Sequence, residues 1–241
     1  MTLRLCVWCG PRTISTALMY SFAQRSDTTV VDEPLYGHYL RVTAAGDYHP
    51  GAAEVIASME SNGANVVRNV ILGDYSTPIV FFKQMTHHLV DLDRDFLDRT
   101  VNVILTRDPR DMLRSYAAVV ETPGLLDTGY LQNAQLLAEL RARGQDPVVL
   151  DSTVTLRDPE GVLRRLCDRL QIPFDPAMLS WKAGPRPEDG VWAPHWYGSV
   201  HRSTGFGPPT THQDPFPAHL EGLLEACLPY YRTLSELALT P

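Results

Sequence analysis

Near its N-terminus the chain reads LRLCVWCGPRTIST over residues 3–16. Residues 3–9 form an apolar run that ends at Gly10 and Pro11, which predicts a buried strand followed by a turn. Apolar residues at helical spacing come next, so a helix is expected over residues 13–24. A strand, a short polar turn and a helix in this order are typical of an α/β fold with an anion site at the turn.

The alternation of strands and helices continues along the chain. Strands are expected at residues 28–31, 78–83, 100–106 and 147–150, and helices at residues 50–62, 109–119, 128–143, 159–170 and 217–238. Such an alternation predicts a parallel sheet covered on both faces. The predicted fold class is therefore α/β, a single domain over residues 1–241 built as a three-layer sandwich with a parallel central sheet.

One long segment, residues 184–217, departs from this alternation. It is rich in Pro, Gly, Trp and His and shows no periodicity. Long irregular segments inside a compact domain are usually functional. We therefore expect a lid-like segment whose aromatic side chains line an acceptor pocket, with a Trp-anchored surface loop as the alternative.

Composition excludes several classes of protein. The chain has 241 residues and a net charge of −7, which argues against a nucleic-acid partner because a phosphate backbone needs a basic face. No apolar run is long enough for a transmembrane segment. Four cysteines are too few for a disulfide scaffold, so a reducing, cytoplasmic setting is expected. Cys6 and Cys9 have C-x-x-C spacing, which leaves a metal or redox pair as an alternative to buried structural thiols.

The turn after the first strand has the donors that an anion needs. Backbone N–H groups at the start of a helix are unpaired, and the helix dipole adds partial positive charge. Thr13, Ser15 and Thr16 add hydroxyl groups, and Arg12 adds a guanidinium group, a cation that can donate two parallel hydrogen bonds. The pattern G-x-x-x-x-G-K-[ST] is absent, so ATP with magnesium is not the expected ligand. The alternative is an ordinary helix start with a surface arginine.

A second anion site is predicted in the stretch ILTRDPRDMLRSY, residues 104–116. Arg107 ends the expected strand, and Ser115 follows two helical turns later, where it can face the same ligand. An arginine fork with a hydroxyl group suits a phosphate monoester. The alternative is a helix start with Asp108 as N-cap and Pro109 in the first turn. Two separate phosphate sites indicate a nucleotide with two phosphorylated positions.

These two motifs resemble those of the PAPS-dependent sulfotransferases, a P-loop-like family that uses 3′-phosphoadenosine 5′-phosphosulfate (PAPS). Residues 11–16 align with the family loop Pro-[Lys/Arg]-Ser-Gly-Thr-Thr, with Ile14 in place of glycine, and Ala17 stands where many members have an aromatic residue. The resemblance implies PAPS as co-substrate. The resemblance also implies which residues bind PAPS. The 5′ side would be held by Arg12, Thr13, Ile14, Ser15 and Thr16, and the 3′-phosphate by Arg107 and Ser115. A late loop with Arg202, Ser203 and Thr204 would close over the nucleotide.

The same resemblance gives candidate catalytic residues. Glu33 follows the second strand, where some family members place a glutamate as general base. Lys83 ends the third predicted strand and would help the transferring sulfuryl group, and His87 is the rival base. The alternatives are that Asp32 and Glu33 cap a helix, and that His87 and its neighbour cap a helix or face solvent.

The resulting functional hypothesis is an enzyme that moves a sulfuryl group from PAPS to a hydroxyl or amine of a small metabolite or glycolipid. No metal is expected, because arginine and lysine supply the positive charge. A P-loop small-molecule kinase and a non-catalytic nucleotide-binding protein remain as alternatives. The identity of the acceptor and the oligomeric state stay open at this stage.

Overall fold

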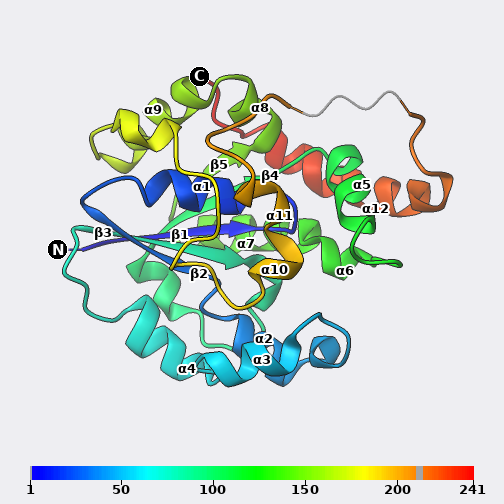
Figure 1. Cartoon of the computed structure of the whole chain (residues 1–241), viewed down its shortest axis with the longest axis horizontal. Coiled ribbons are helices and arrows are strands. Elements are labelled where there is room, and N and C mark those ends of the chain that lie inside the picture. The colour runs from blue at the N-terminus through cyan, green and yellow to red at the C-terminus, as the bar shows by residue number, and fades with distance from the viewer. Residues whose placement is uncertain (1, 210–213) are drawn as a thin grey trace.

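A computed structural model describes residues 2–209 and 214–241 (Figure 1). In these residues five parallel strands form one sheet in the spatial order β2-β3-β1-β4-β5. The strands are β1 (Leu3–Cys9), β2 (Thr28–Asp32), β3 (Ile79–Met85), β4 (Val101–Thr106) and β5 (Val148–Asp151). The predicted α/β fold with a parallel sheet is confirmed.

The central strand β1 explains why the sequence is apolar from Leu5 to Cys9. Leu5 and Val7 pack into the core on one face of the sheet, whereas Cys6 and Trp8 pack into the core on the other face. A strand buried on both faces has no position for a polar side chain. Cys9 lies on the face opposite to Cys6, so these two thiols cannot share a disulfide or a metal ion.

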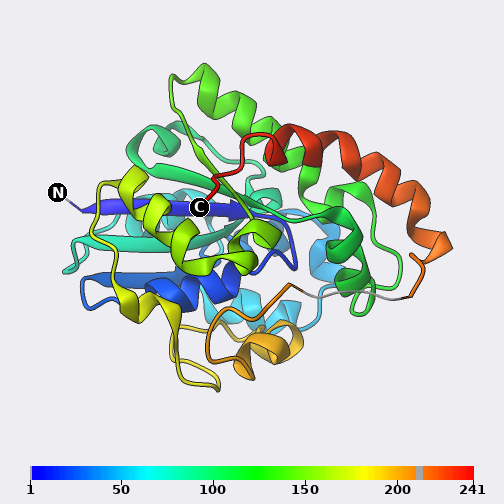
Figure 2. The same ribbon diagram turned by 90° about the horizontal axis from the view of Figure 1, so that it is seen from above.

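Helices cover both faces of the sheet, as Figure 2 shows with α12 above it and α1 below. One layer contains α1 (Ser15–Phe22), α8 (Ser152–Arg157) and α9 (Pro159–Leu170), and the other contains α7 (Tyr130–Ala142) and α12 (Glu221–Ser235). The remaining α-helices are α2 (Tyr36–Val42), α3 (Ala52–Ser58), α4 (Gly63–Val66), α5 (Pro109–Ala117), α6 (Leu125–Thr128), α10 (Ala193–Trp196) and α11 (Gly198–His201). Six short 3₁₀ or π turns complete the described chain: η1 (Ala44–Asp47), η2 (Val67–Ile71), η3 (Thr86–His88), η4 (Asp95–Arg99), η5 (Pro176–Leu179) and η6 (Ala218–Leu220).

The structure corrects several expected boundaries. The helix expected at residues 50–62 ends at Ser58, and the helix expected at residues 128–143 is divided at Gly129, whose φ of 78° is left-handed. Strand β3 continues two residues past Lys83, because its pairing with β1 extends to Met85. Helices α2 and α8 were not predicted, since both are too short for a clear apolar period.

The segment at residues 184–217 is less irregular than expected, because it contains α10 and α11. Both short helices lie beyond the carboxyl ends of the strands (Figure 1). Trp192 and Tyr197 of this segment pack with Tyr36 and Leu40 of α2 in one buried cluster. Residues 210–213 of the predicted lid lie outside the described residues. No helix in the described chain is long and apolar enough to cross a membrane.

Candidate active site

The loop between β1 and α1 has an unusual backbone. Arg12 and Ile14 both adopt left-handed conformations, with φ of 58° and 61°. For a β-branched residue such as Ile14 this conformation is strained, and glycine is the residue that adopts it without cost. Ser152, the first residue of α8, stabilises the loop by donating a hydrogen bond to the carbonyl of Thr13 (2.8 Å). The loop therefore has, at Ile14, a backbone conformation that favours glycine, although the residue there is isoleucine.

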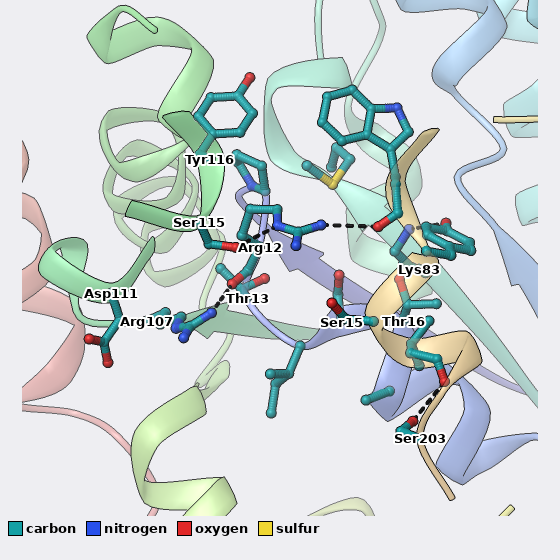
Figure 3. A pocket seen from close by; sticks show the side chains of 18 of the residues that line it. Arg12, Thr13, Ser15, Thr16, Lys83, Arg107, Asp111, Ser115, Tyr116 and Ser203 are labelled. Carbon is teal, nitrogen blue, oxygen red and sulfur yellow. Dashed lines mark hydrogen bonds between the residues drawn. The ribbon is translucent and has the colours of Figure 1, made fainter. Parts of the chain in front are cut away.

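The two predicted anion sites meet in the structure. Arg107 at the end of β4 donates from Nη1 to the carbonyl oxygen of Arg12 (2.8 Å), and Arg12 donates from Nε to Oγ of Ser115 on α5 (2.8 Å) (Figure 3). Burial, and next the charge of Arg107, lowers the pKa of Arg12. Two guanidinium groups this close repel each other, so an anion bound between them would be favourable.

These groups line one cavity of about 550 Å³ at the carboxyl ends of the strands. Such a position is where parallel α/β sheets bind ligands. The cavity is lined by all five loop residues predicted to bind the nucleotide, by both members of the second anion site, by the three catalytic candidates and by one residue of the late loop: Arg12, Thr13, Ile14, Ser15, Thr16, Arg107, Ser115, Glu33, Lys83, His87 and Ser203.

Two predicted residues do not belong to this cavity. Arg202 and Thr204 are exposed and are not among its lining residues. Ser203 between them lines the cavity, accepts a hydrogen bond from Nε1 of Trp181 (3.1 Å) and donates to the carbonyl of Val200 (2.7 Å). Because the chain turns at this point, neighbouring side chains point in different directions. Sequence reasoning cannot separate such neighbours.

Lys83 is the centre of a buried polar cluster. Its Nζ donates to Oδ1 of Asp32 (2.9 Å), to Oε1 of Glu33 and to the hydroxyl of Tyr197 (2.6 Å). Burial by itself lowers the pKa of Lys83, but the attraction of Asp32 and Glu33 outweighs it, so the pKa lies well above its usual value. The lysine is therefore a fixed cation beside the anion sites.

Glu33 reaches this lysine through a turn in its own backbone. Its φ of 41° is left-handed, directly after β2 ends at Asp32. Consecutive side chains of a regular strand point to opposite faces, yet here both carboxylates contact one ammonium group. Burial raises the pKa of Glu33, while the charge of Lys83 opposes that rise. A carboxylate with a raised pKa is suited to general base catalysis.

The rival base His87 has a different environment. It lies in a cluster of aromatic and imidazole rings with Tyr39 and His88, at centroid distances of 5.1 Å and 4.8 Å. Burial, and next the charge of His49, lowers the pKa of His87 to about 3. An imidazole with this pKa is uncharged at neutral pH and is a weak proton acceptor. The geometry therefore favours Glu33 over His87 as the base.

Sequence reasoning missed two members of the Lys83 cluster. Asp32 was considered as a helix cap, and Tyr197 as one of several aromatic residues in the lid. The signal for Asp32 was its position at the end of β2, beside Glu33. Tyr197 had no signal of its own, because its contact with Lys83 spans 114 residues of sequence.

Among residues 2–209 and 214–241, no three or more His, Cys, Asp or Glu side chains are placed so that they could hold a metal ion. The three histidines near the cavity, His49, His87 and His88, pack against aromatic rings.

The model of the sulfotransferase domain family matches residues 3–238. The chain belongs to this family. The resemblance drawn from the two sequence motifs is thus confirmed. Solved sulfotransferase domains share its fold: one from the Synechococcus PCC 7002 olefin synthase (TM-score 0.56, 17% identity, 94% of this chain and 95% of that one) and one from the curacin biosynthetic pathway (TM-score 0.57, 14% identity, 100% and 99%).

Two curated relatives from Arabidopsis thaliana have higher identity. They are the branched-chain-amino-acid aminotransferase-like proteins 1 and 2, at 46% and 40% identity over 228 residues. In both comparisons the match covers 94% of this chain and 40% of the relative. The chain of this sulfotransferase domain therefore spans about two fifths of the length of these relatives.

Proposed function

We propose that this sulfotransferase domain moves a sulfuryl group from PAPS to a hydroxyl or amine of a small metabolite or glycolipid. One observation carries the proposal. Arg12, Arg107 and Ser115 meet at one part of a cavity that also contains Glu33 and Lys83. Two phosphate-binding groups and a carboxylate–lysine pair in one cavity are what transfer from a bisphosphorylated nucleotide requires.

In this proposal the nucleotide lies across the start of α1. Arg107 and Ser115 bind the 3′-phosphate, and Arg12 with Thr13, Ile14, Ser15 and Thr16 of the loop binds the 5′-phosphosulfate through side chains and backbone N–H groups. The present bond from Arg12 to Ser115 would be exchanged in part for bonds to phosphate oxygens. Ser203, which lines the cavity, would contact the nucleotide from the segment that follows α11.

The chemistry is an in-line displacement at sulfur. The acceptor oxygen or nitrogen forms a bond to sulfur while the bond from sulfur to the bridging phosphate oxygen breaks. The acceptor proton passes to the Glu33 carboxylate, and the negative charge that develops on the departing 5′-phosphate is stabilised by Arg12 and the loop N–H groups. The products are the sulfated acceptor and 3′-phosphoadenosine 5′-phosphate (PAP).

Lys83 assists this step only if it releases one of its present bonds. An ammonium group has three N–H donors, and all three are directed to Asp32, Glu33 and Tyr197. Of these partners, Glu33 and Tyr197 line the cavity. Release of the bond to Glu33 would free a base for the acceptor and a donor for the transferring group at the same time.

Isothermal titration calorimetry with PAP, AMP and magnesium-ATP tests the nucleotide assignment. We expect PAP to bind much more tightly than AMP, because only PAP has the 3′-phosphate that Arg107 and Ser115 would bind. Equal affinities for PAP and AMP would contradict the proposal, and tight binding of magnesium-ATP without preference for PAP would favour a kinase. Transfer of labelled sulfate from PAPS to a panel of hydroxyl and amine compounds then separates an enzyme from a non-catalytic nucleotide-binding protein.

A further inference from the structure

We propose that Asp32 and Tyr197 are positioning residues: they hold Lys83 as a permanent cation and leave Glu33 as the carboxylate that exchanges a proton. This inference rests on the proposed function of the same cavity. It assigns different tasks to two adjacent carboxylates that contact one lysine. The argument depends on their hydrogen bonds, their access to the cavity and the charges around them.

The two carboxylates differ first in their hydrogen bonds. Asp32 accepts from Lys83 at Oδ1 (2.9 Å) and, at Oδ2, from the Tyr197 hydroxyl (2.6 Å) and the backbone N–H of Gly190 (3.3 Å). Within the described part of the chain, the donor to the Glu33 side chain is Lys83. The Asp32 side chain therefore has three donors, which hold it in place against Lys83 and Tyr197, whereas the Glu33 side chain has one.

They differ next in access. Glu33 lines the cavity, whereas Asp32 is not among the lining residues and is bonded to two that are, Lys83 and Tyr197. A proton from an acceptor in the cavity can therefore reach Glu33 without a change in the fold. The left-handed turn at Glu33 produces this arrangement, since it brings the second carboxylate to the cavity side of the same ammonium group.

The charges around the cluster support the division. One ammonium group faces two carboxylates, and the negative charge of Asp32 is among the causes that raise the pKa of Glu33. Burial raises the pKa of Cys9 to about 11, and it also raises the pKa values of Tyr36 and Tyr197. It lowers the pKa of His88 well below its usual value. The other titratable groups facing the cluster are thus uncharged at neutral pH: Cys9 of β1, Tyr36 of α2, His88 of η3 and Tyr197. With Lys83 paired to Asp32, the remaining negative charge belongs to Glu33.

Tyr197 joins this cluster to the segment that follows residue 184. Its hydroxyl donates to Asp32 and accepts from Lys83 (2.6 Å) and from Nε1 of Trp192 (3.0 Å), so its hydrogen-bonding capacity is filled. The preceding residue, Trp196, accepts from Nη1 of Arg12 through its carbonyl (3.0 Å). Trp196 therefore holds the side chain of Arg12 in the proposed anion site, and Tyr197 holds that of Lys83 in the proposed proton-transfer site.

A carboxyl NMR titration tests the inference without knowledge of the acceptor. The full chain, labelled with ¹³C at the carboxyl groups of Asp and Glu, is titrated in the presence of PAP as wild type and as Asp32→Asn, with signals assigned through Glu33→Gln and Asp32→Asn. We expect Glu33 in the wild type to take up its proton at a pH above the ordinary range for glutamate. In Asp32→Asn the Glu33 midpoint should move to lower pH, because a repelling charge is gone and Lys83 pairs with Glu33 alone.

Asp27→Asn is the matched control, since it makes the same change just before the other end of β2, where Asp27 pairs with Arg25 (2.8 Å). It should leave the Glu33 midpoint unchanged. Tyr197→Phe keeps both carboxylates, removes one donor from Asp32, and should also move the Glu33 midpoint.

An unchanged Glu33 midpoint in Asp32→Asn would overturn the inference, as would a wild-type Glu33 midpoint within the ordinary range for glutamate. If Asp32→Asn does not fold by circular dichroism, Tyr197→Phe decides, and an unchanged Glu33 midpoint in that variant would overturn the inference. Failure of the wild type to bind PAP would instead contradict the proposed function, whatever the carboxylates do.

Discussion

Arg107 shows how a single side chain can serve structure and binding together. It holds the carbonyl of Arg12 in the loop after β1, and it lies at the cavity wall beside Ser115 (Figure 3). An arginine in that position orders the loop and can present further N–H donors to a ligand. Its contribution should therefore be measurable as ligand affinity.

We expect Arg107→Ala to weaken PAP binding by about 1.5–3 kcal/mol, the range for hydrogen bonds to charged groups. This loss corresponds to a roughly 10- to 100-fold higher Kd in calorimetry. The control is Arg110→Ala on the following helix α5, because Arg110 packs near the ring of Phe216 and does not line the cavity. An unchanged Kd for Arg107→Ala would remove Arg107 from the nucleotide site.

Glu33→Gln should leave PAP binding intact and lower turnover by about 10²–10⁴-fold, the usual contribution of a general base. Turnover of the wild type should fall as the pH decreases through the raised pKa of Glu33, because the protonated acid cannot accept the acceptor proton. If His87 were the base, the fall in turnover at low pH would lie near pH 3, since the pKa of His87 is about 3. A pH–rate profile of wild type, Glu33→Gln and His87→Ala distinguishes the two, and full activity of Glu33→Gln would transfer the role elsewhere.

At the scale of elements, the loop between β1 and α1 retains a left-handed backbone at Ile14, with φ of 61°. An L-residue pays about 1–2 kcal/mol for this conformation, whereas glycine does not. The side chain of Ile14 also packs against the main core, and this packing stabilises the folded chain and so opposes the cost of the strain. The free-energy cost of the left-handed backbone can therefore be separated from the packing of the Ile14 side chain only by comparing two variants that both lack this side chain.

We expect Ile14→Gly to be more stable than Ile14→Ala by about 1 kcal/mol, because both lose the same packing and only alanine keeps the strain. Denaturant unfolding of the two variants gives this difference directly. Leu18 of α1 is the control position, since a glycine inside a helix is less stable than alanine by about 1 kcal/mol. The same order at both positions would show that the loop is not strained at Ile14.

For the whole molecule, the sheet order and the segment after residue 184 bring the proposed anion sites and the proposed proton-transfer site into one cavity. A ligand that bridges both should stabilise the folded chain as a unit. At a hundredfold excess over its Kd, PAP should add about 2.7 kcal/mol to the free energy of unfolding. For a chain of this size that is a rise in Tm of about 5–10 °C.

Thermal unfolding with PAP and with AMP at equal concentration measures this effect. AMP should give a smaller rise, because it lacks the 3′-phosphate. Arg107→Ala should reduce the difference between the two nucleotides while Arg110→Ala keeps it. A rise of equal size with both nucleotides would mean that the second anion site is not used.

Much of the architecture could be predicted because the relevant signals are local. The apolar run at residues 3–9, the turn at Gly10 and the pairing of Asp108 with Pro109 at a helix start each depend on a few neighbouring residues. Asp108 caps α5 as expected, since its side chain accepts from the N–H of Arg110 (2.8 Å). Helix ends and the short helices α2 and α8 were beyond such reasoning, because tertiary packing sets them.

The sequence by itself determined the parallel α/β fold, the family and the two anion motifs, since strand ends in a parallel sheet share one edge whatever the detailed packing. Only the tertiary structure decided which side chains of that edge work together. It placed Ser203 in the cavity and left Arg202 and Thr204 outside, and it brought Tyr197 to Lys83. These outcomes depend on contacts between segments far apart in the chain, where no periodicity or spacing carries information about which side chains meet.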